Sequence, residues 1–294
     1  MANYIDLHAH STASDGIYSP GQLLHKAHEA GLHVLALTDH DTTNGIAEAA
    51  QTASELGIDF IPGLEINTET AGGEVHVLGY FPELERPAFQ AVLTTLRNAR
   101  ERRGQRMVEL LNEHGIMISW ERVREIAQGS VGRPHVARAL IEAGYVQSIP
   151  EAFDKYIGTD GIGYVHRYRL SPVDATRLID SANGLPVIAH PLTLPGLTTL
   201  REWLPDLCAA GMVGLETYYG PYTEKDEREL LALAVEYDLI PTGGSDFHAP
   251  GSHPTPLGGR YVPVEAVERL KAAAAQRQGR VPPTFVLPPP VAEK

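Results

Sequence analysis

The stretch Gly31-Leu32-His33-Val34-Leu35-Ala36-Leu37-Thr38-Asp39-His40-Asp41 contains the pattern that decides the fold. Gly31 is typical of a helix end. The apolar run from residue 34 to 38 is typical of a strand that is buried on both faces. Polar side chains able to bind metal follow that run at once. A helix, a buried strand and a polar cluster at the carboxyl end of the strand are the repeating parts of a parallel α/β fold.

The same alternation continues on both sides of this stretch. Further strands are expected at 4–8, 59–65, 74–81, 185–189, 213–218 and 239–243, and helices at 19–30, 45–56, 197–210, 224–237 and 264–276, with another beginning at Ser171-Pro172. The first helix carries a capping signal, since Ser19 precedes Pro20 and Gln22 follows three residues after the serine. Seven strands separated mostly by helices predict an α/β fold with a largely parallel sheet, which closes more easily as a barrel than it spreads as an open sheet.

The middle of the chain has helical periodicity and hardly any strand signal. We therefore expect residues 97–164 to form a helical insertion, or cap, between a first barrel part at 1–96 and a second at 165–294. The tail from Arg280 carries five prolines and is expected to be an extended strap or disordered.

Composition excludes several classes of protein. The 294 residues carry a formal charge of −13, which argues against binding of long nucleic acid such as DNA. A small phosphorylated substrate remains compatible, because bound divalent cations reverse the local charge. One cysteine, Cys208, permits no internal disulfide. No apolar run approaches the roughly 18 residues of a membrane span, and the first residues lack a signal-peptide pattern, so a cytoplasmic protein without membrane contact is expected.

Residues able to bind metal recur where the expected strands end. They are His8, His10, His40, Glu65, His76, His190, Asp246 and His248. In a parallel barrel the carboxyl ends of the strands share one face, where active sites form. Alternate residues of a strand point the same way, so His8 and His10 can reach one cation. A single histidine after a strand is more often an ordinary polar group, but repetition at successive strand ends favours a metal centre.

Imidazole and carboxylate ligands suit Mn²⁺, Fe²⁺ or Zn²⁺. A carboxylate such as Glu65 or Asp246 can bridge two cations about 3.5–4 Å apart. Four other histidines, at 25, 28, 33 and 114, are expected on the surface, and those at 166 and 253 are left open.

The ordered motifs resemble the PHP (polymerase and histidinol phosphatase) family. They are His8-Ala9-His10 with Ser14-Asp15-Gly16, Thr38-Asp39-His40-Asp41, Gly63-Leu64-Glu65, His76, Ala189-His190-Pro191 and Gly244-Ser245-Asp246-Phe247-His248. The resemblance implies a distorted (β/α)7 barrel and two or three divalent metal ions, most often Mn²⁺, Fe²⁺ or Zn²⁺. By motif, it implies one metal at His8, His10, Glu65 and Asp246, a second at Glu65, His76 and His190, and a third at Asp15, His40 and His248.

The insertion resembles one branch of that family. Its motifs are Gly132-Arg133-Pro134-His135, Phe153-Asp154-Lys155-Tyr156-Ile157-Gly158 and Tyr164-Val165-His166-Arg167. They are similar to the short phosphoesterases that remove the 3′-phosphate of nucleoside 3′,5′-bisphosphates, some of which, like ribonuclease AM, trim RNA from its 5′ end. The resemblance implies that Arg133, His135 and Lys155 bind a substrate phosphate, with Arg167 a weaker candidate. The alternative is a helix cap with Arg133 in solvent.

Other polar residues receive smaller roles. Asp39 and Asp41 are expected to orient His40 by hydrogen bonds. Glu216 follows the sixth expected strand and is a candidate for holding a ligand residue in place, but no motif gives it a ligand role of its own. The basic run Arg97–Arg103 is expected to be a solvated helix face rather than an RNA-binding patch.

The sequence therefore predicts a metal-dependent phosphoesterase acting on a small nucleotide or short RNA. One alternative is a histidinol-phosphate phosphatase, against which the Gly132–His135 motif argues. Another is a non-catalytic metal-binding module that acts with a partner. The oligomeric state is left open.

Overall fold

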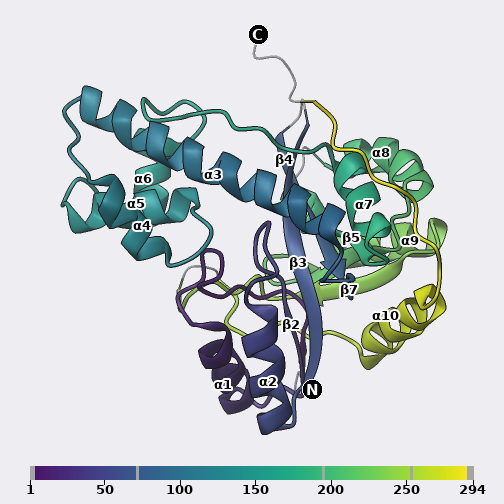
Figure 1. Ribbon diagram of the computed structural model, residues 1–294. Coiled ribbons are helices and arrows are strands. Elements are labelled where there is room, and N and C mark those ends of the chain that lie inside the picture. The colour runs from purple at the N-terminus through teal and green to yellow at the C-terminus, as the bar shows by residue number, and fades with distance from the viewer. Residues whose placement is uncertain (1–3, 71–72, 194–195, 252–253, 290–294) are drawn as a thin grey trace.

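A computed structural model describes residues 4–70, 73–193, 196–251 and 254–289. Seven strands form one sheet in the order of the sequence. They are β1 (Ile5–Asp6), β2 (Val34–Leu37), β3 (Asp59–Thr70), β4 (Gly73–Tyr80), β5 (Leu185–Ala189), β6 (Gly214–Tyr219) and β7 (Ile240–Gly244). The sheet curls into a nearly closed barrel (Figure 1). The Leu7 amide donates to the Gly243 carbonyl at 3.1 Å, which joins the first strand region to the last.

Strand β4 runs against both of its neighbours, whereas the other strand pairs are parallel. Only two residues separate β3 from β4 in the sequence. A connection this short can join two antiparallel strands but not two parallel ones. The sheet is thus largely parallel, as expected, but with one reversed strand. The reversal aligns His76, near the start of β4, with Ala189 at the carboxyl end of β5. His76 therefore reaches the same rim of the barrel as the other strand ends.

Helices surround the barrel. They are α1 (Pro20–Glu29), α2 (Ile46–Leu56), α7 (Pro172–Ser181), α8 (Leu197–Ala209), α9 (Glu224–Glu236) and α10 (Val264–Arg277), with a 3-10 turn at Pro191–Thr193. The expected capping box of α1 is present, because the Ser19 hydroxyl accepts from the Gln22 amide and the Gln22 side chain accepts from the Ser19 amide. Each helix presents an apolar face to the sheet, which stabilises the barrel by hydrophobic burial.

The long helix α3 (Pro87–Glu113) extends from the barrel to a group of short helices (Figure 1). These are α4 (Trp120–Ala127), α5 (Arg133–Glu142), α6 (Ile149–Ala152) and a π-helix at Phe153–Ile157. The first turns of α3 pack into the barrel core through Phe89 and Leu93, and its last turns pack among the short helices through Met107 and Leu111. Helix α3 thus runs without a break across residue 97, and the division of the chain at 97 and 164 stays a prediction.

The proline-rich tail lies along the barrel as a strap over its described part, 280–289. Phe285 and Leu287 pack against the barrel core, and the Tyr168 hydroxyl donates to the Pro288 carbonyl at 2.7 Å. Residues 290–294, and His253, lie outside the described residues. Within the described ranges, no helix has both the length and the apolar character to cross a membrane.

Candidate metal centre and its arginine-lined cavity

All nine residues expected to bind metal meet at one rim of the barrel. The structure groups His8, His10, Glu65 and Asp246; then His40, Glu65 and His76; then His10, Asp15, His40 and His248. His190 joins through its Nε2 atom, 3.1 Å from Glu65 Oε1. Their assignment to individual cations stays a prediction.

The distances within the first group fit a divalent cation. His8 Nε2 lies 3.4 Å from Glu65 Oε2 and 3.3 Å from Asp246 Oδ1, and His10 Nε2 lies 3.3 Å and 3.2 Å from the same two oxygens. Ligands about 2.0–2.1 Å from a tetrahedral centre are themselves about 3.3–3.4 Å apart. His8 Nε2, His10 Nε2 and Glu65 Oε2 are buried without a hydrogen bond to any described residue. A bound cation would satisfy these three atoms.

Glu65 on β3 is the centre of the arrangement. Its Oε1 atom lies 2.9 Å from His76 Nδ1 and 3.1 Å from His190 Nε2, while Oε2 lies 2.9 Å from His40 Nδ1. Burial acts to raise the pKa of the Glu65 carboxyl, but the nearby histidines, His40 first, hold this pKa well below its usual range. The carboxylate is therefore ionised, and each of its oxygens faces a different set of imidazoles. This placement suits a bridging ligand.

Glu216 holds two of the histidines in place. It is fully buried, and its Oε1 atom lies 3.0 Å from His8 Nδ1, while Oε2 accepts from the His190 amide at 2.6 Å. Since Nδ1 of His8 is engaged, its Nε2 is left to face Glu65 and Asp246. This agrees with the expectation that Glu216 supports ligand residues. Its partners could not be predicted, because the pairing with His8 joins residues 208 positions apart.

The expectation for Asp39 and Asp41 was wrong. The Asp39 carboxylate accepts from the hydroxyls of Ser11 and Ser14 at 2.6 Å each and so fixes the loop that carries Asp15. Asp41 instead pairs with arginines from the insertion side, as described below. The His40 imidazole lies instead beside Glu65, with Nδ1 2.9 Å from Oε2, because its strand end pairs with β3 at that residue.

The backbone is strained at this rim. Asp41, His190 and Asp246 have φ values of 54°, 26° and 54°, in the left-handed region that non-glycine residues rarely adopt. Such conformations cost free energy and concentrate at functional sites. His190 and Asp246 lie in the cluster, whereas Asp41 pairs with Arg100 and Arg167 on the other wall.

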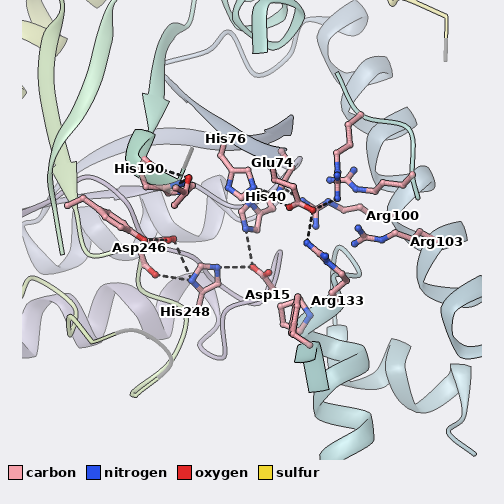
Figure 2. A pocket seen from close by; sticks show the side chains of 17 residues that line it. Asp15, His40, Glu74, His76, Arg100, Arg103, Arg133, His190, Asp246 and His248 are labelled. Carbon is pink, nitrogen blue, oxygen red and sulfur yellow. Dashed lines mark hydrogen bonds and ion pairs between the residues drawn. The ribbon is translucent and has the colours of Figure 1, made fainter. Parts of the chain in front are cut away.

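Arginines form the other wall of a cavity of about 300 Å³ that includes the metal-ligand cluster. Arg100, Arg103 and Arg133 are labelled in Figure 2. The other two are Arg167 and Arg169. Carboxylates hold several of them. Arg100 Nε and Arg167 Nη2 lie 2.5 and 3.4 Å from Asp41 Oδ2, and Arg133 and Arg169 bind Glu74 Oε1 at 2.7 and 2.6 Å.

The expectation that the basic run Arg97–Arg103 is a solvated helix face was wrong for Arg100 and Arg103. Both are buried, with 4% and 5% of their surface exposed. The signal that identifies them is their spacing on α3: positions 93, 96, 100, 103 and 107 follow the three- and four-residue steps of one buried helix face. Arginines inside an apolar stripe indicate a polar cavity next to that face.

The three residues expected to bind phosphate lie in different surroundings. Arg133 lines the cavity, with its guanidinium 5.1 Å from the Phe153 ring centre. His135 is fully buried, and its Nδ1 atom accepts from the Gly132 amide at 2.8 Å, so it caps α5 instead of lining the cavity. Lys155 is more than half exposed and pairs with Glu151 at 2.6 Å, because it lies on the outer side of its helix. Of these three residues only Arg133 lines the cavity, as does the weaker candidate Arg167, and phosphate binding by either stays a prediction.

Comparisons with known proteins agree with this geometry. The family model for the PHP domain matches residues 6–153. A 5′-3′ exoribonuclease of Haemophilus influenzae is 38% identical over 253 residues, covering 85% of this chain and 92% of that protein. A 3′,5′-nucleoside bisphosphate phosphatase of Chromobacterium violaceum is 36% identical over 265 residues, covering 89% and 91%.

A solved structure from Bifidobacterium adolescentis, assigned as a metal-dependent phosphoesterase, superposes with a TM-score of 0.84 at 30% identity, covering 93% of this chain and 97% of that one. These similarities confirm the expected fold class, a (β/α)7 barrel, and the expected enzyme class, a metal-dependent phosphoesterase. The chain belongs to the PHP domain family.

Proposed function

We propose that the protein removes the 3′-phosphate of nucleoside 3′,5′-bisphosphates and cleaves short 5′-phosphorylated RNA from its 5′ end. One observation carries the proposal: the metal-ligand cluster and the arginine cluster are opposite walls of one cavity. The names of the two curated relatives describe substrates that fit this pairing.

The two walls suit two different phosphates. The five arginines face three carboxylates, Asp41, Glu69 and Glu74, so the arginine wall has excess positive charge. Guanidinium groups bind phosphate through paired hydrogen bonds. A nucleoside bisphosphate would place its 5′-phosphate there and its 3′-phosphate against the histidines and carboxylates.

The chain's own residues supply position and charge. The arginines hold the 5′-phosphate, which does not react. The translational and rotational entropy of the substrate is then lost on binding, and less of it remains to be lost when the 3′-phosphate reaches the transition state. Asp41 and Glu74 hold these guanidiniums in fixed orientations. Divalent cations bound by the cluster would polarise the 3′-phosphoryl group and lower the pKa of a coordinated water. We propose Mn²⁺ as the metal, with Fe²⁺ and Zn²⁺ as alternatives for the same imidazole and carboxylate ligands.

The test is phosphate release from adenosine 3′,5′-bisphosphate by the Mn²⁺-loaded protein, with the nucleotide product identified. Release that leaves the 5′-monophosphate is expected, and a chelator or His10→Ala should abolish it. Arg133→Ala should lower kcat/KM for the bisphosphate about 10- to 100-fold, the effect of losing a charged hydrogen bond, and leave p-nitrophenyl phosphate nearly unchanged. Lys155→Ala is the matched control, because this exposed cation of the insertion lies outside the cavity.

Two outcomes would redirect the proposal. Equal losses on both substrates would remove Arg133 from phosphate recognition. Hydrolysis of histidinol phosphate, without any release from the bisphosphate, would favour a histidinol-phosphate phosphatase. The complete set of metal-ligand residues argues against a non-catalytic module.

A further inference from the structure

Arg103 is a buried cation that forms no ion pair with a described residue, although the Glu74 carboxylate is near enough for Arg103 to help lower the pKa of that group. Its side chain belongs to α3 and is 5% exposed, and its Nε atom is buried without a hydrogen-bond partner. Figure 2 shows no dashed line reaching its guanidinium. Burial, with the nearby guanidiniums of Arg167, Arg100, Arg133 and Arg169, holds the pKa of Arg103 well below its usual range. A buried cation among other cations calls for an anion from outside the chain.

Arg103 also forms part of a second cavity. This cavity, of about 220 Å³, lies between α3 and residues 165–168. Arg103 and Arg167 line both cavities, so this pair forms the wall between them. The lining of the second cavity also includes Arg102 and His166, which are exposed to solvent. The wall behind the proposed 5′-phosphate position therefore leads to a basic groove that reaches the surface.

The charge of the groove fits further phosphate. Arg102, Arg103 and Arg167 line it together with His166, and the carboxylate nearest to His166 is that of Glu69, 3.6 Å from its Nε2 atom. Such a concentration of arginine is unusual in a chain with a formal charge of −13. Grooves that follow a phosphate chain are lined in this way.

The two arginines between the cavities have nitrogen atoms without a hydrogen bond to a described residue. Arg100 is fixed by Asp41, and Arg133 by Glu74. Nε of Arg103 has no hydrogen bond to a described residue, and the same holds for Nε and Nη1 of Arg167, whose Nη2 lies 3.4 Å from Asp41 Oδ2. Arg103 and Arg167 therefore have hydrogen-bonding capacity at the boundary of the two cavities that the described residues do not use.

We infer that the second cavity receives phosphate groups attached to the 5′-phosphate of the substrate, so that the enzyme accepts 5′-di- and triphosphorylated ends. This inference rests on the proposed function. The bond that breaks is still the one between phosphorus and the 3′-oxygen. Water supplies the hydroxyl of the released phosphate and the proton of the 3′-hydroxyl, and the 5′-polyphosphate stays on the product. A pocket closed behind the first phosphate would exclude these substrates.

The experiment compares adenosine 3′-phosphate 5′-diphosphate with adenosine 3′,5′-bisphosphate as substrates of the Mn²⁺-loaded protein. The wild type should use the two with kcat/KM values within about tenfold of each other. Arg102→Ala should lower kcat/KM for the 5′-diphosphate about two- to fivefold, as expected for one exposed ionic contact, and leave the bisphosphate unchanged. Arg124→Ala is the matched control. This exposed arginine of α4 lines a different cavity and should affect neither substrate.

Preference of the wild type for the bisphosphate by about a hundredfold, or equal losses with Arg102→Ala on both substrates, would overturn the inference. Calorimetric binding of AMP and ADP to the metal-free protein tests it without catalysis. ADP should bind more tightly than AMP, and Arg102→Ala should remove the difference. Equal binding by the wild type would reject the groove. Tighter binding of ADP without hydrolysis of either substrate would reject the proposed function and leave the groove.

Discussion

Glu216 acts on the metal-ligand cluster through His8 and His190, both of which it contacts. Residues that orient a ligand imidazole typically contribute about 10- to 100-fold to metal affinity. Glu216→Ala should weaken Mn²⁺ binding by about that factor, measured by chelator competition. Glu216→Gln should lie between, because its amide oxygen can still accept from His8, whereas its NH₂ cannot accept from the His190 amide. Unchanged Mn²⁺ affinity with lower activity would instead give Glu216 a role at the substrate.

At the residue scale, the gathering of the nine expected metal-binding residues at one rim could be predicted, and most of the cavity arginines could not. His8, His40 and Asp246 follow buried strands, so the sequence pattern alone brings them to one rim. Arg103 faces the same cavity only because α3 passes over the barrel rim. The residues at the strand ends carry no signal that predicts this position of α3. The signal for Arg103 is the helical spacing of buried positions, which becomes readable once α3 is known to be buried on that face.

At the element scale, the reversed strand β4 is the feature that the sequence pattern left unclear. An expected strand at 74–81 was correct, but its direction depends on the short connection to β3 and on the length of that strand, which continues to Thr70. Direction decides whether His76 lies at the rim with Glu65 or at the opposite end of the barrel. The antiparallel register places His76 beside Asn67, one diagonal step from Glu65.

Gly79 lets helix α7 pack closely on this hairpin. A Cβ atom at this position would lie 3.0 Å from Ile179 Cγ1 and from Leu64 Cδ2. Gly79→Ala should therefore lower the free energy of unfolding by about 1–3 kcal/mol, as overpacking does in a core. Ile179→Ala alone should cost about 2–5 kcal/mol by leaving a cavity. Since the added methyl group fills part of that cavity, the double variant should lose less than the sum of the two in urea unfolding. Strict additivity would show that the backbone, not Ile179, absorbs the added methyl group.

At the scale of the whole molecule, the cavity joins parts of the chain that are distant in sequence. Its arginines come from α3, from the start of α5 and from residues 167–169, and its metal-ligand residues come from strand ends between residues 8 and 248. The barrel could be predicted from repeated local patterns. The placement of the helical segment over its rim could not, because it depends on how α3 packs on the barrel and on buried pairs such as Arg100 with Asp41.

Metal removal should affect the stability of the whole molecule. The buried histidines and carboxylates of the cluster are held together at 3.2–3.4 Å, and a ligand that binds only the folded state stabilises it by about 2.7 kcal/mol at a hundredfold excess over Kd. In a protein of this size, chelation should then lower the unfolding midpoint by about 5–10 °C. Differential scanning fluorimetry with EDTA and with added Mn²⁺, Fe²⁺ or Zn²⁺ measures this shift.

Two variants locate the origin of that shift. His10 belongs to two of the three ligand groups, so His10→Ala should remove most of the response to metal. Arg133→Ala should keep it, because Arg133 lies on the opposite wall of the cavity and binds Glu74. A full metal response in His10→Ala would mean that the stabilising cations bind elsewhere on this acidic protein. Loss of the response in both variants would mean that the two walls are not independent. The arginines would then maintain the geometry of the metal-ligand cluster in addition to binding the substrate.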